Sequence, residues 1–185
     1  HTDGYYNRPD EQVRAIVMHW VSAADSGGGS LFMDPEMAYM LLRDENPDYI
    51  RVLMQPDAMT IPANVESGAE IRPAQSGPVF SVENSTRSLH MRYTARTRSI
   101  EWKSEPVMHM ATGFLSELLN GDSDCIFSHR LQAGEGIICN NVLHGREAFS
   151  DGVGSVRLLY RARYHDRIKG TEMMAGNHGE QTCSG

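Results

Sequence analysis

Apolar and polar positions follow two different periods along the chain. The nearly continuous apolar run from Ala15 to Ala23 is rich in β-branched and aromatic residues, which predicts a buried strand. Ser30 to Met33 predicts a second, shorter strand. Asp34 followed by Pro35 is typical of a helix N-cap and first helical residue, and Asn46 ends that helix and starts another turn or two.

The clearest amphipathic helix lies in the second half of the chain, from Glu105 to Asn120. Its apolar residues fall on one stripe at a spacing of 3.6 residues, and Gly121 supplies a C-terminal cap. The stripe comprises Val107, Met110, Ala111, Phe114, Leu115, Leu118 and Leu119. Further strands are expected over residues 58–61, 79–82, 89–94, 125–131, 136–139 and 155–164.

Short strands therefore dominate, and a few helices are expected to pack outside them. This pattern favours a mainly β fold with helical cover, of the β-sandwich or jelly-roll type. The residues from Thr171 onward are polar and rich in glycine, so we expect them to fray. The sequence thus predicts one domain over residues 1–170 and a polar tail over residues 171–185.

Composition narrows the classes of partner. The net charge is −7, and both nucleic acid and anionic membranes attract positive surfaces, so we expect neither as a partner. The three cysteines form no Cys-x-x-Cys pair, which argues against a disulfide framework or zinc ribbon and for a cytoplasmic location. No apolar run approaches the roughly 20 residues of a membrane-spanning helix. Because the chain begins at His1 without an initiator Met, we expect a fragment of a longer protein.

Three residues are candidate metal ligands. His1 and Asp3 are two positions apart, so in an extended segment their side chains face the same way. His144 follows a buried-looking strand. Two histidines and one carboxylate can form a facial triad that leaves three positions on iron(II) open. Two plainer interpretations stay open at this point: a histidine on the surface at the chain end, and a histidine in the core.

The segment from Val156 to Tyr164 alternates along a predicted strand. Arg157, Arg161 and Arg163 share one face, and mainly apolar residues share the other. Either the apolar face packs on the core and the arginines face water, or the arginines line the interior of a barrel. The second alternative needs an anionic ligand, because unpaired buried guanidinium groups are costly.

Four sequence blocks follow one another along the chain: His1-Thr2-Asp3-Gly4, Ser26 to Leu31, Asn141 to Arg146, and Arg157 to Arg161. Together they resemble the iron(II)/2-oxoglutarate-dependent dioxygenases of the taurine dioxygenase (TauD/TfdA) superfamily, from the start of the chain to about residue 167. The first two blocks, and the third block with Phe149 after it, are most similar to the glutarate hydroxylase and γ-butyrobetaine hydroxylase branches. The resemblance implies a double-stranded β-helix, or jelly roll, that is truncated at its N-terminus.

The resemblance implies roles for individual residues. His1, Asp3 and His144 would hold Fe(II). Arg157 would pair with the distal carboxylate of the cosubstrate 2-oxoglutarate, and Ser30 would hydrogen-bond the same group. Arg161 would face the cosubstrate head or an acidic substrate. Arg163 could take the place of Arg157 at the distal carboxylate.

The implied reaction uses O₂ to hydroxylate an unactivated C–H bond of a small acidic molecule, with release of succinate and CO₂. Gly4, Tyr6, Arg96 and Arg163 are the candidate substrate residues, and Asn140 and Asn141 are candidates for support of His144. Two rival functions remain. One is a copper monooxygenase in which His1 chelates through its amine and its ring, and the other is a jelly-roll sensor that binds a metal or an acid without turnover. Self-association into a homo-oligomer also stays open.

Overall fold

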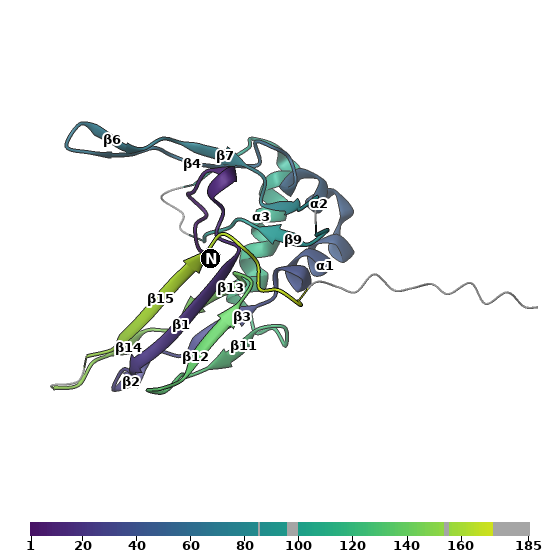
Figure 1. The fold of residues 1–185 in the computed structure, drawn as a ribbon. Coiled ribbons are helices and arrows are strands. Elements are labelled where there is room, and N and C mark those ends of the chain that lie inside the picture. Colours follow the sequence, from purple (N-terminus) through teal and green to yellow (C-terminus); the bar gives the residue numbers. More distant parts are fainter. Residues whose placement is uncertain (85, 96–99, 154–155, 172–185) are drawn as a thin grey trace, which may run out of the picture.

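The computed structural model describes residues 1–84, 86–95, 100–153 and 156–171. One part of the fold is a β-sandwich (Figure 1). Both sheets of the sandwich have three strands, and all their pairings are antiparallel. One sheet has the order β12–β1–β15, with bounds Gly136–Cys139, Ala15–Ser22 and Leu158–Tyr164. The other has the order β11–β3–β13, with bounds Phe127–His129, Ser30–Met33 and Leu143–Arg146.

The core of the sandwich follows from the alternation along β1. Ile16, Met18 and Trp20 are buried, and Phe32 of the opposite sheet packs against them. Residues directly opposite each other in an antiparallel pair share a face of the sheet. Because Met18 pairs with Arg161, the arginine face of β15 points into the sandwich.

The outer face of the same sheet is apolar and exposed. Leu158, Tyr160 and Tyr164 of β15 are between 44% and 65% exposed. Of the two sequence interpretations of this strand, packing of its apolar face on the core is therefore wrong. The strand also begins at Leu158 instead of residue 155, so Arg157 lies immediately before it.

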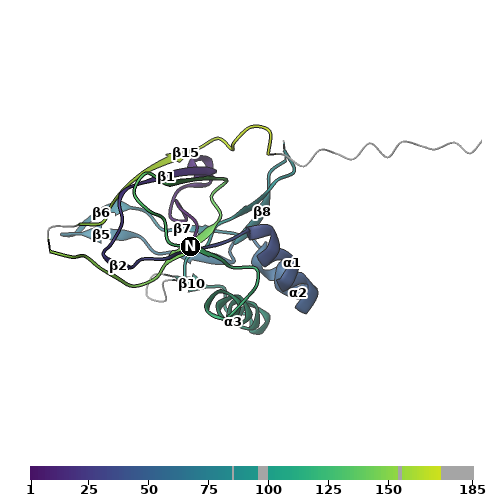
Figure 2. The ribbon, with the colours of Figure 1, turned by 90° about the horizontal axis from the view of Figure 1, so that it is seen from below.

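Three helices and two small sheets form a second core beside the sandwich (Figures 1 and 2). The predicted N-cap is confirmed, since the Asp34 side chain accepts a hydrogen bond from Glu36 N (2.8 Å). Asn46, which was predicted to start another turn or two, caps the next helix by accepting a hydrogen bond from Asp48 N (3.0 Å). The elements are α1 Pro35–Glu45, α2 Pro47–Leu53, α3 Pro106–Asn120, the sheet of β10 Glu101–Trp102, β4 Met59–Ile61 and β7 Gln75–Gly77, and the hairpin of β8 Phe80–Val82 and β9 Leu89–Met91.

The buried face of α3 differs from the predicted stripe. Met108, Ala111 and Leu115 are fully buried, whereas Met110 is 51% exposed. Burial is centred on the line through Met108 and Leu115, because the helix packs there against α1 and α2. Met110 lies about 200° around the helix from Met108 and faces away, so its predicted burial is wrong.

The remaining elements are short. The projecting hairpin of β5 Asn64–Glu66 and β6 Ala69–Arg72 was not expected from the pattern (Figure 1). The pairing of β2 Ser26–Gly27 with β14 Phe149–Ser150 was also unexpected, since these glycine-rich residues predicted only a break. A 3₁₀ turn, η1, covers Pro9–Glu11. Within the described residues, no helix is long and apolar enough to cross a membrane.

Candidate metal centre

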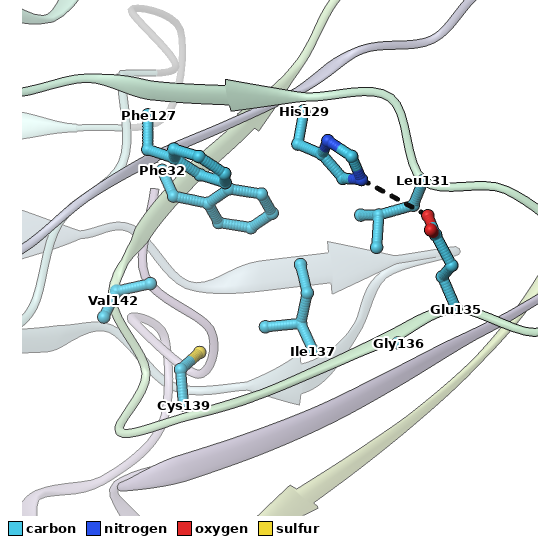
Figure 3. Close-up of a pocket in the computed structure, with 9 residues that line it drawn as sticks. All are labelled: Phe32, Phe127, His129, Leu131, Glu135, Gly136, Ile137, Cys139 and Val142. Carbon is cyan, nitrogen blue, oxygen red and sulfur yellow. Dashed lines mark hydrogen bonds and ion pairs between the residues drawn. The ribbon is translucent and has the colours of Figure 1, made fainter.

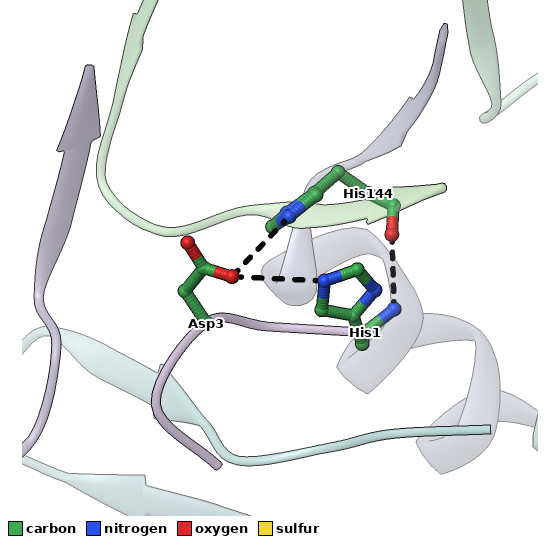
Figure 4. Close-up of side chains that lie close together, drawn as sticks. All are labelled: His1, Asp3 and His144. Atoms are coloured by element: carbon green, nitrogen blue, oxygen red, sulfur yellow. Dashed lines mark hydrogen bonds and ion pairs between the residues drawn. The ribbon is translucent and has the colours of Figure 1, made fainter. Parts of the chain in front are cut away.

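Backbone pairing brings His1 and His144 together across the sequence. The backbone nitrogen of His1 donates to the carbonyl oxygen of His144 (3.0 Å), and the N–H of His144 donates back to the carbonyl oxygen of His1 (2.9 Å). Such a reciprocal pair places two side chains on the same side. The two rings accordingly lie with their centroids 4.3 Å apart (Figure 4).

The segment from His1 to Asp3 is fixed from both sides and is not a strand. Thr2 N–H donates to the carbonyl oxygen of Tyr93 (2.9 Å), and Tyr93 N–H donates to the Thr2 hydroxyl (3.1 Å). Asp3 N–H donates to the side-chain oxygen of Asn141 (2.8 Å). The expected convergence of His1 and Asp3 thus occurs through these hydrogen bonds and a turn that begins at Asp3, in place of the extended geometry predicted.

Three side chains converge on one point (Figure 4). The Oδ1 atom of Asp3 lies 3.6 Å from Nε2 of His1 and 3.7 Å from Nε2 of His144. Among the described residues, this trio is the group with ligand atoms within 4.8 Å of one another that could hold a metal ion. The Asp3 and His144 side chains are buried, whereas that of His1 is 37% exposed, so solvent reaches the trio from the side of His1.

The tautomer of His144 follows from its surroundings. Its Nδ1 lies 2.9 Å from the carbonyl oxygen of Val142, which can only accept, so Nδ1 carries the proton. Burial is the main cause that lowers the pKa of His144, which keeps the ring neutral. Its Nε2 is buried and has no hydrogen-bond partner within the described part of the chain. The Nε2 lone pair therefore faces the Asp3 carboxylate, an arrangement that a cation between them would stabilise.

Two arginines of β15 hold the Asp3 carboxylate in its ionised form. Arg161 donates from one nitrogen to Oδ1 (2.8 Å) and Oδ2 (3.1 Å), and Arg163 donates from Nε to Oδ2 (3.0 Å). Burial alone would raise the pKa of Asp3, but the His1 ring and the two guanidinium groups lower it well below its ordinary value. A neutral imidazole beside an ionised carboxylate is a donor set that suits a divalent cation.

A cavity of about 320 Å³ adjoins the trio and contains three of the other predicted residues, Ser30, Arg157 and Arg161. The Arg157 guanidinium lies over the rings of Trp20 (5.6 Å) and Phe149 (5.4 Å). Burial, and next the charge of Arg146, lower the pKa of Arg157. A partly buried cation beside a second cation suits a ligand with an acidic group. The cavity is lined by His1, Met18, Trp20, Ser30, Phe32, His144, Gly145, Arg146, Arg157, Leu159 and Arg161.

Comparison with known proteins gives the family. The family model described as "Taurine catabolism dioxygenase TauD, TfdA family" matches residues 1–163. This chain belongs to the TauD/TfdA family. The resemblance inferred from the sequence blocks is thereby confirmed for the family, while the glutarate and γ-butyrobetaine branches remain predictions.

The TauD/TfdA chain has named relatives at low identity. It is 27% identical over 169 residues to a uridine-5'-phosphate dioxygenase from Amycolatopsis sp., covering 89% of this chain and 59% of that protein. An asparagine oxygenase solved with Fe(II), 3-hydroxyasparagine and succinate is 19% identical with a TM-score of 0.62, over 87% of this chain and 47% of that one. The PvcB protein from Pseudomonas aeruginosa is also 19% identical with a TM-score of 0.62, over 90% of this chain and 56% of that one.

These likenesses confirm the predicted fold. The asparagine oxygenase shares this fold, and together with the family match it identifies the sandwich as the double-stranded β-helix expected from the sequence blocks. The TauD/TfdA chain spans about half to three-fifths of the length of these relatives.

Two residues at the site have roles that were not predicted from the sequence. Arg146 lines the cavity, and its guanidinium lies 4.2 Å from the centroid of the Phe149 ring. Its signal was its place two positions after His144 in the third sequence block. Asn141 binds the backbone of Asp3, whereas it was expected to support His144. Asn140 bonds to Ile168 and Thr171 instead of to His144.

The candidate substrate residues are more scattered. Gly4 has a φ of +70°, and a Cβ there would lie 2.6 Å from a methyl group of Val13, which explains the glycine by packing. The Tyr6 ring lies 5.7 Å from the guanidinium carbon of Arg72. Arg96 lies outside the described residues. The backbone nitrogen of His1 is bound to the His144 carbonyl, an arrangement that does not favour a copper brace, which would need that nitrogen as a ligand.

A separate cavity of about 510 Å³ lies along the strands β11 and β12 (Figure 3). Phe32 lines both this cavity and the one at the trio. The walls of the 510 Å³ cavity are mainly apolar. At its edge, Nε2 of His129 lies 3.3 Å from a carboxylate oxygen of Glu135. Among the described residues, those that line this cavity form no group of metal-ligand atoms like the trio.

Proposed function

We propose that this chain is the catalytic part of an iron(II)- and 2-oxoglutarate-dependent dioxygenase. It hydroxylates an unactivated C–H bond of a small acidic molecule and releases succinate and CO₂. The observation that carries the proposal is the unpartnered Nε2 of His144, which faces Asp3 Oδ1 at 3.7 Å with the His1 ring beside it. His1, Asp3 and His144 would hold Fe(II), and the chemistry supplied by Fe(II) with 2-oxoglutarate when bound is oxidation by O₂.

The cavity beside the trio suits the cosubstrate. Arg157 would hold the distal carboxylate of 2-oxoglutarate by bidentate hydrogen bonds from its guanidinium group. Ser30 would donate a hydrogen bond from its hydroxyl group to the same carboxylate. Trp20 and Phe149 keep the guanidinium in place by stacking. Arg161 lies between this cavity and Asp3, where it can meet the cosubstrate head or an acidic substrate.

The charge balance supports an acidic substrate. Arg161 and Arg163 bond the Asp3 carboxylate, and Arg146, Arg157 and Arg161 line the adjacent cavity. Asp151 adds a second negative charge near Arg157. Positive charge still exceeds negative charge after a divalent cation and a dianionic cosubstrate are added. The relative named uridine-5'-phosphate dioxygenase extends the acidic class to nucleotides, so carboxylates, sulfonates and nucleoside monophosphates are the compounds to test.

Several finer assignments are part of this proposal. Gly4, Tyr6 and Arg96 stay candidates for substrate contact, whereas Arg163 is bound to Asp3 and is better placed to support that carboxylate. Residues 1–170 would form the catalytic domain and residues 171–185 a polar tail, in a cytoplasmic protein. Self-association is a separate prediction, which sedimentation velocity tests.

Turnover tests the proposal. The chain is loaded anaerobically with Fe(II), mixed with 2-oxoglutarate and candidate acids, and exposed to O₂, and succinate is measured. We expect succinate from the parent and from the exposed-site control His129→Ala, and none above background from His144→Ala or Asp3→Ala. Binding of iron and cosubstrate without succinate would favour the sensor, and equal succinate from all variants would refute the trio.

A further inference from the structure

Asn141 joins the two parts of the metal centre through a single buried side chain. It is 3% exposed and lies three residues before His144. Its Oδ1 accepts a hydrogen bond from Asp3 N–H (2.8 Å), and its Nδ2 donates to the carbonyl oxygens of Asp3 (2.9 Å) and Val13 (2.6 Å). Both backbone polar groups of Asp3 are thus bound by one residue that is 138 positions away.

The residue type fits this task closely. Asn141 has a φ of +54°, in the left-handed region that asparagine tolerates better than most residues with a side chain. The amide group supplies an acceptor for Asp3 N–H and donors for two carbonyl groups at once. Aspartate lacks the donors, and glycine keeps the backbone conformation but loses all three hydrogen bonds.

The forces on Asp3 show why the contact matters. Arg161 and Arg163 draw the Asp3 carboxylate toward β15 through hydrogen bonds of 2.8 to 3.1 Å. Asn141 holds the Asp3 backbone against the segment that leads into β13, where His144 lies. The distance between Oδ1 of Asp3 and Nε2 of His144 therefore depends on both attachments.

We propose that Asn141 is a positioning residue, which sets the affinity of the centre for a divalent metal by fixing Asp3 relative to His144. It acts through Asp3 and does not itself face the metal position. This inference rests on the proposed metal-binding function of the trio. Residues that orient metal ligands change metal affinity by about 10- to 100-fold when they are replaced.

Asn140 offers a matched control in the neighbouring position. Its side chain also makes two hydrogen bonds, from Nδ2 to the hydroxyl of Thr171 (2.8 Å) and to Oδ1 from Ile168 N–H (2.9 Å). These partners belong to the segment after β15, so replacement of Asn140 removes comparable bonds away from the trio.

The test compares Asn141→Gly, Asn141→Asp and Asn140→Gly with the parent chain. Anaerobic calorimetry with Co(II) gives the dissociation constant, visible absorption of bound Co(II) reports its ligand geometry, and thermal unfolding without metal reports stability. We expect both Asn141 variants to bind Co(II) about 10- to 100-fold more weakly, with a changed absorption spectrum. Asn140→Gly should bind Co(II) with the affinity of the parent chain, even if its thermal midpoint falls as much as those of the Asn141 variants.

Parental Co(II) affinity and spectrum in both Asn141 variants would overturn the positioning role. Failure of both to fold would also overturn it, because Asn141 would then serve folding and not metal affinity. These results differ from failure of the proposed function, in which the parent chain itself would not bind Co(II).

Discussion

Hydrogen bonds orient two of the three candidate ligand side chains at the centre, Asp3 and His144. His144 uses Nδ1 to bond the Val142 carbonyl, which leaves Nε2 free. Arg163 donates to Oδ2 of Asp3, and Oδ1 accepts from Arg161 and faces both histidine rings. Such contacts fix ring orientation and tautomer before a ligand binds. Residue identity and spacing suggested the ligands from sequence, but the hydrogen bonds that orient them appear only in the structure.

The first prediction concerns the cosubstrate cation. Arg157→Met should weaken 2-oxoglutarate binding to the iron-loaded chain by roughly 10- to 150-fold, since a hydrogen bond to a charged group contributes about 1.5–3 kcal/mol. Anaerobic titration of the metal-to-ligand charge-transfer absorption measures this affinity. The control Arg130→Met removes a guanidinium that bonds the carbonyls of Ala24 and Asp25, and should leave the affinity unchanged.

An unchanged affinity in Arg157→Met would move the carboxylate-binding role to Arg161 or Arg163. The alternation of the strand does not rank these three arginines, because it shows only that they share a face, whereas the family resemblance placed Arg157 first. The structure separates them by their partners: Arg161 and Arg163 bond Asp3, whereas Arg157 stacks on two aromatic rings.

At the scale of elements, prediction succeeded where the determining chemistry is local. Asp34 caps its helix as expected, and a new helix starts at Asn46 as expected, because a side-chain oxygen beside the first turn needs no distant partner. Strand β13 was not predicted, since its four residues include His144 and Gly145 and are ordered by pairing with β3. The β5–β6 hairpin is an exception: it was not predicted, although Ser67-Gly68 is a local turn signal whose φ values of 52° and 82° suit a tight hairpin turn.

The second prediction tests the two faces of the β12–β1–β15 sheet. Ile16 is fully buried, so Ile16→Ala should lower the free energy of unfolding by about 2–5 kcal/mol. Ile138 is 69% exposed on the outer face, so Ile138→Ala should change it by less than about 0.5 kcal/mol. Urea unfolding measures both, and similar losses in the two variants would contradict the assigned faces.

On the scale of the whole molecule, the centre depends on contacts between distant parts of the sequence. His1 and His144 are 143 positions apart and meet through reciprocal backbone hydrogen bonds. Arg92 joins the segment after Asp3 to the second core, donating to the carbonyl oxygens of Tyr5, Met59, Gly77 and Gln75. Periodicity carries no information on such pairings. The conjunction of sequence blocks indicated that His1 and His144 meet, and it gave no signal for the contacts of Arg92.

The third prediction concerns pH and the polar cavity of about 490 Å³ that His90 lines together with Arg14 and Glu83. Burial, then the charge of Arg14, lower the pKa of His90 from 6.5 to about 4, with Arg167 and Arg92 acting in the same direction and Glu83 opposing. The unfolded chain thus binds a proton more readily, so this contribution is present above pH 6.5 and is lost toward pH 4.

One pKa unit corresponds to 1.36 kcal/mol, so the loss from His90 over this range amounts to about 3 kcal/mol. Urea unfolding at several pH values measures this loss. Between pH 6.5 and pH 4, the free energy of unfolding should fall less for His90→Gln than for the parent chain. The exposed His165→Gln serves as control and should follow the parent. Identical pH dependence in all three proteins would show that His90 does not stay neutral in the fold.

The most direct test of the account is an anaerobic titration of the chain with Fe(II) and 2-oxoglutarate, followed by visible absorption. If His1, Asp3 and His144 hold the metal beside the Arg157 cavity, the parent develops a weak metal-to-ligand charge-transfer band that saturates at one iron per chain. His144→Ala should develop none. A band of equal strength in both proteins, or none in the parent, would contradict the assignment of the metal centre.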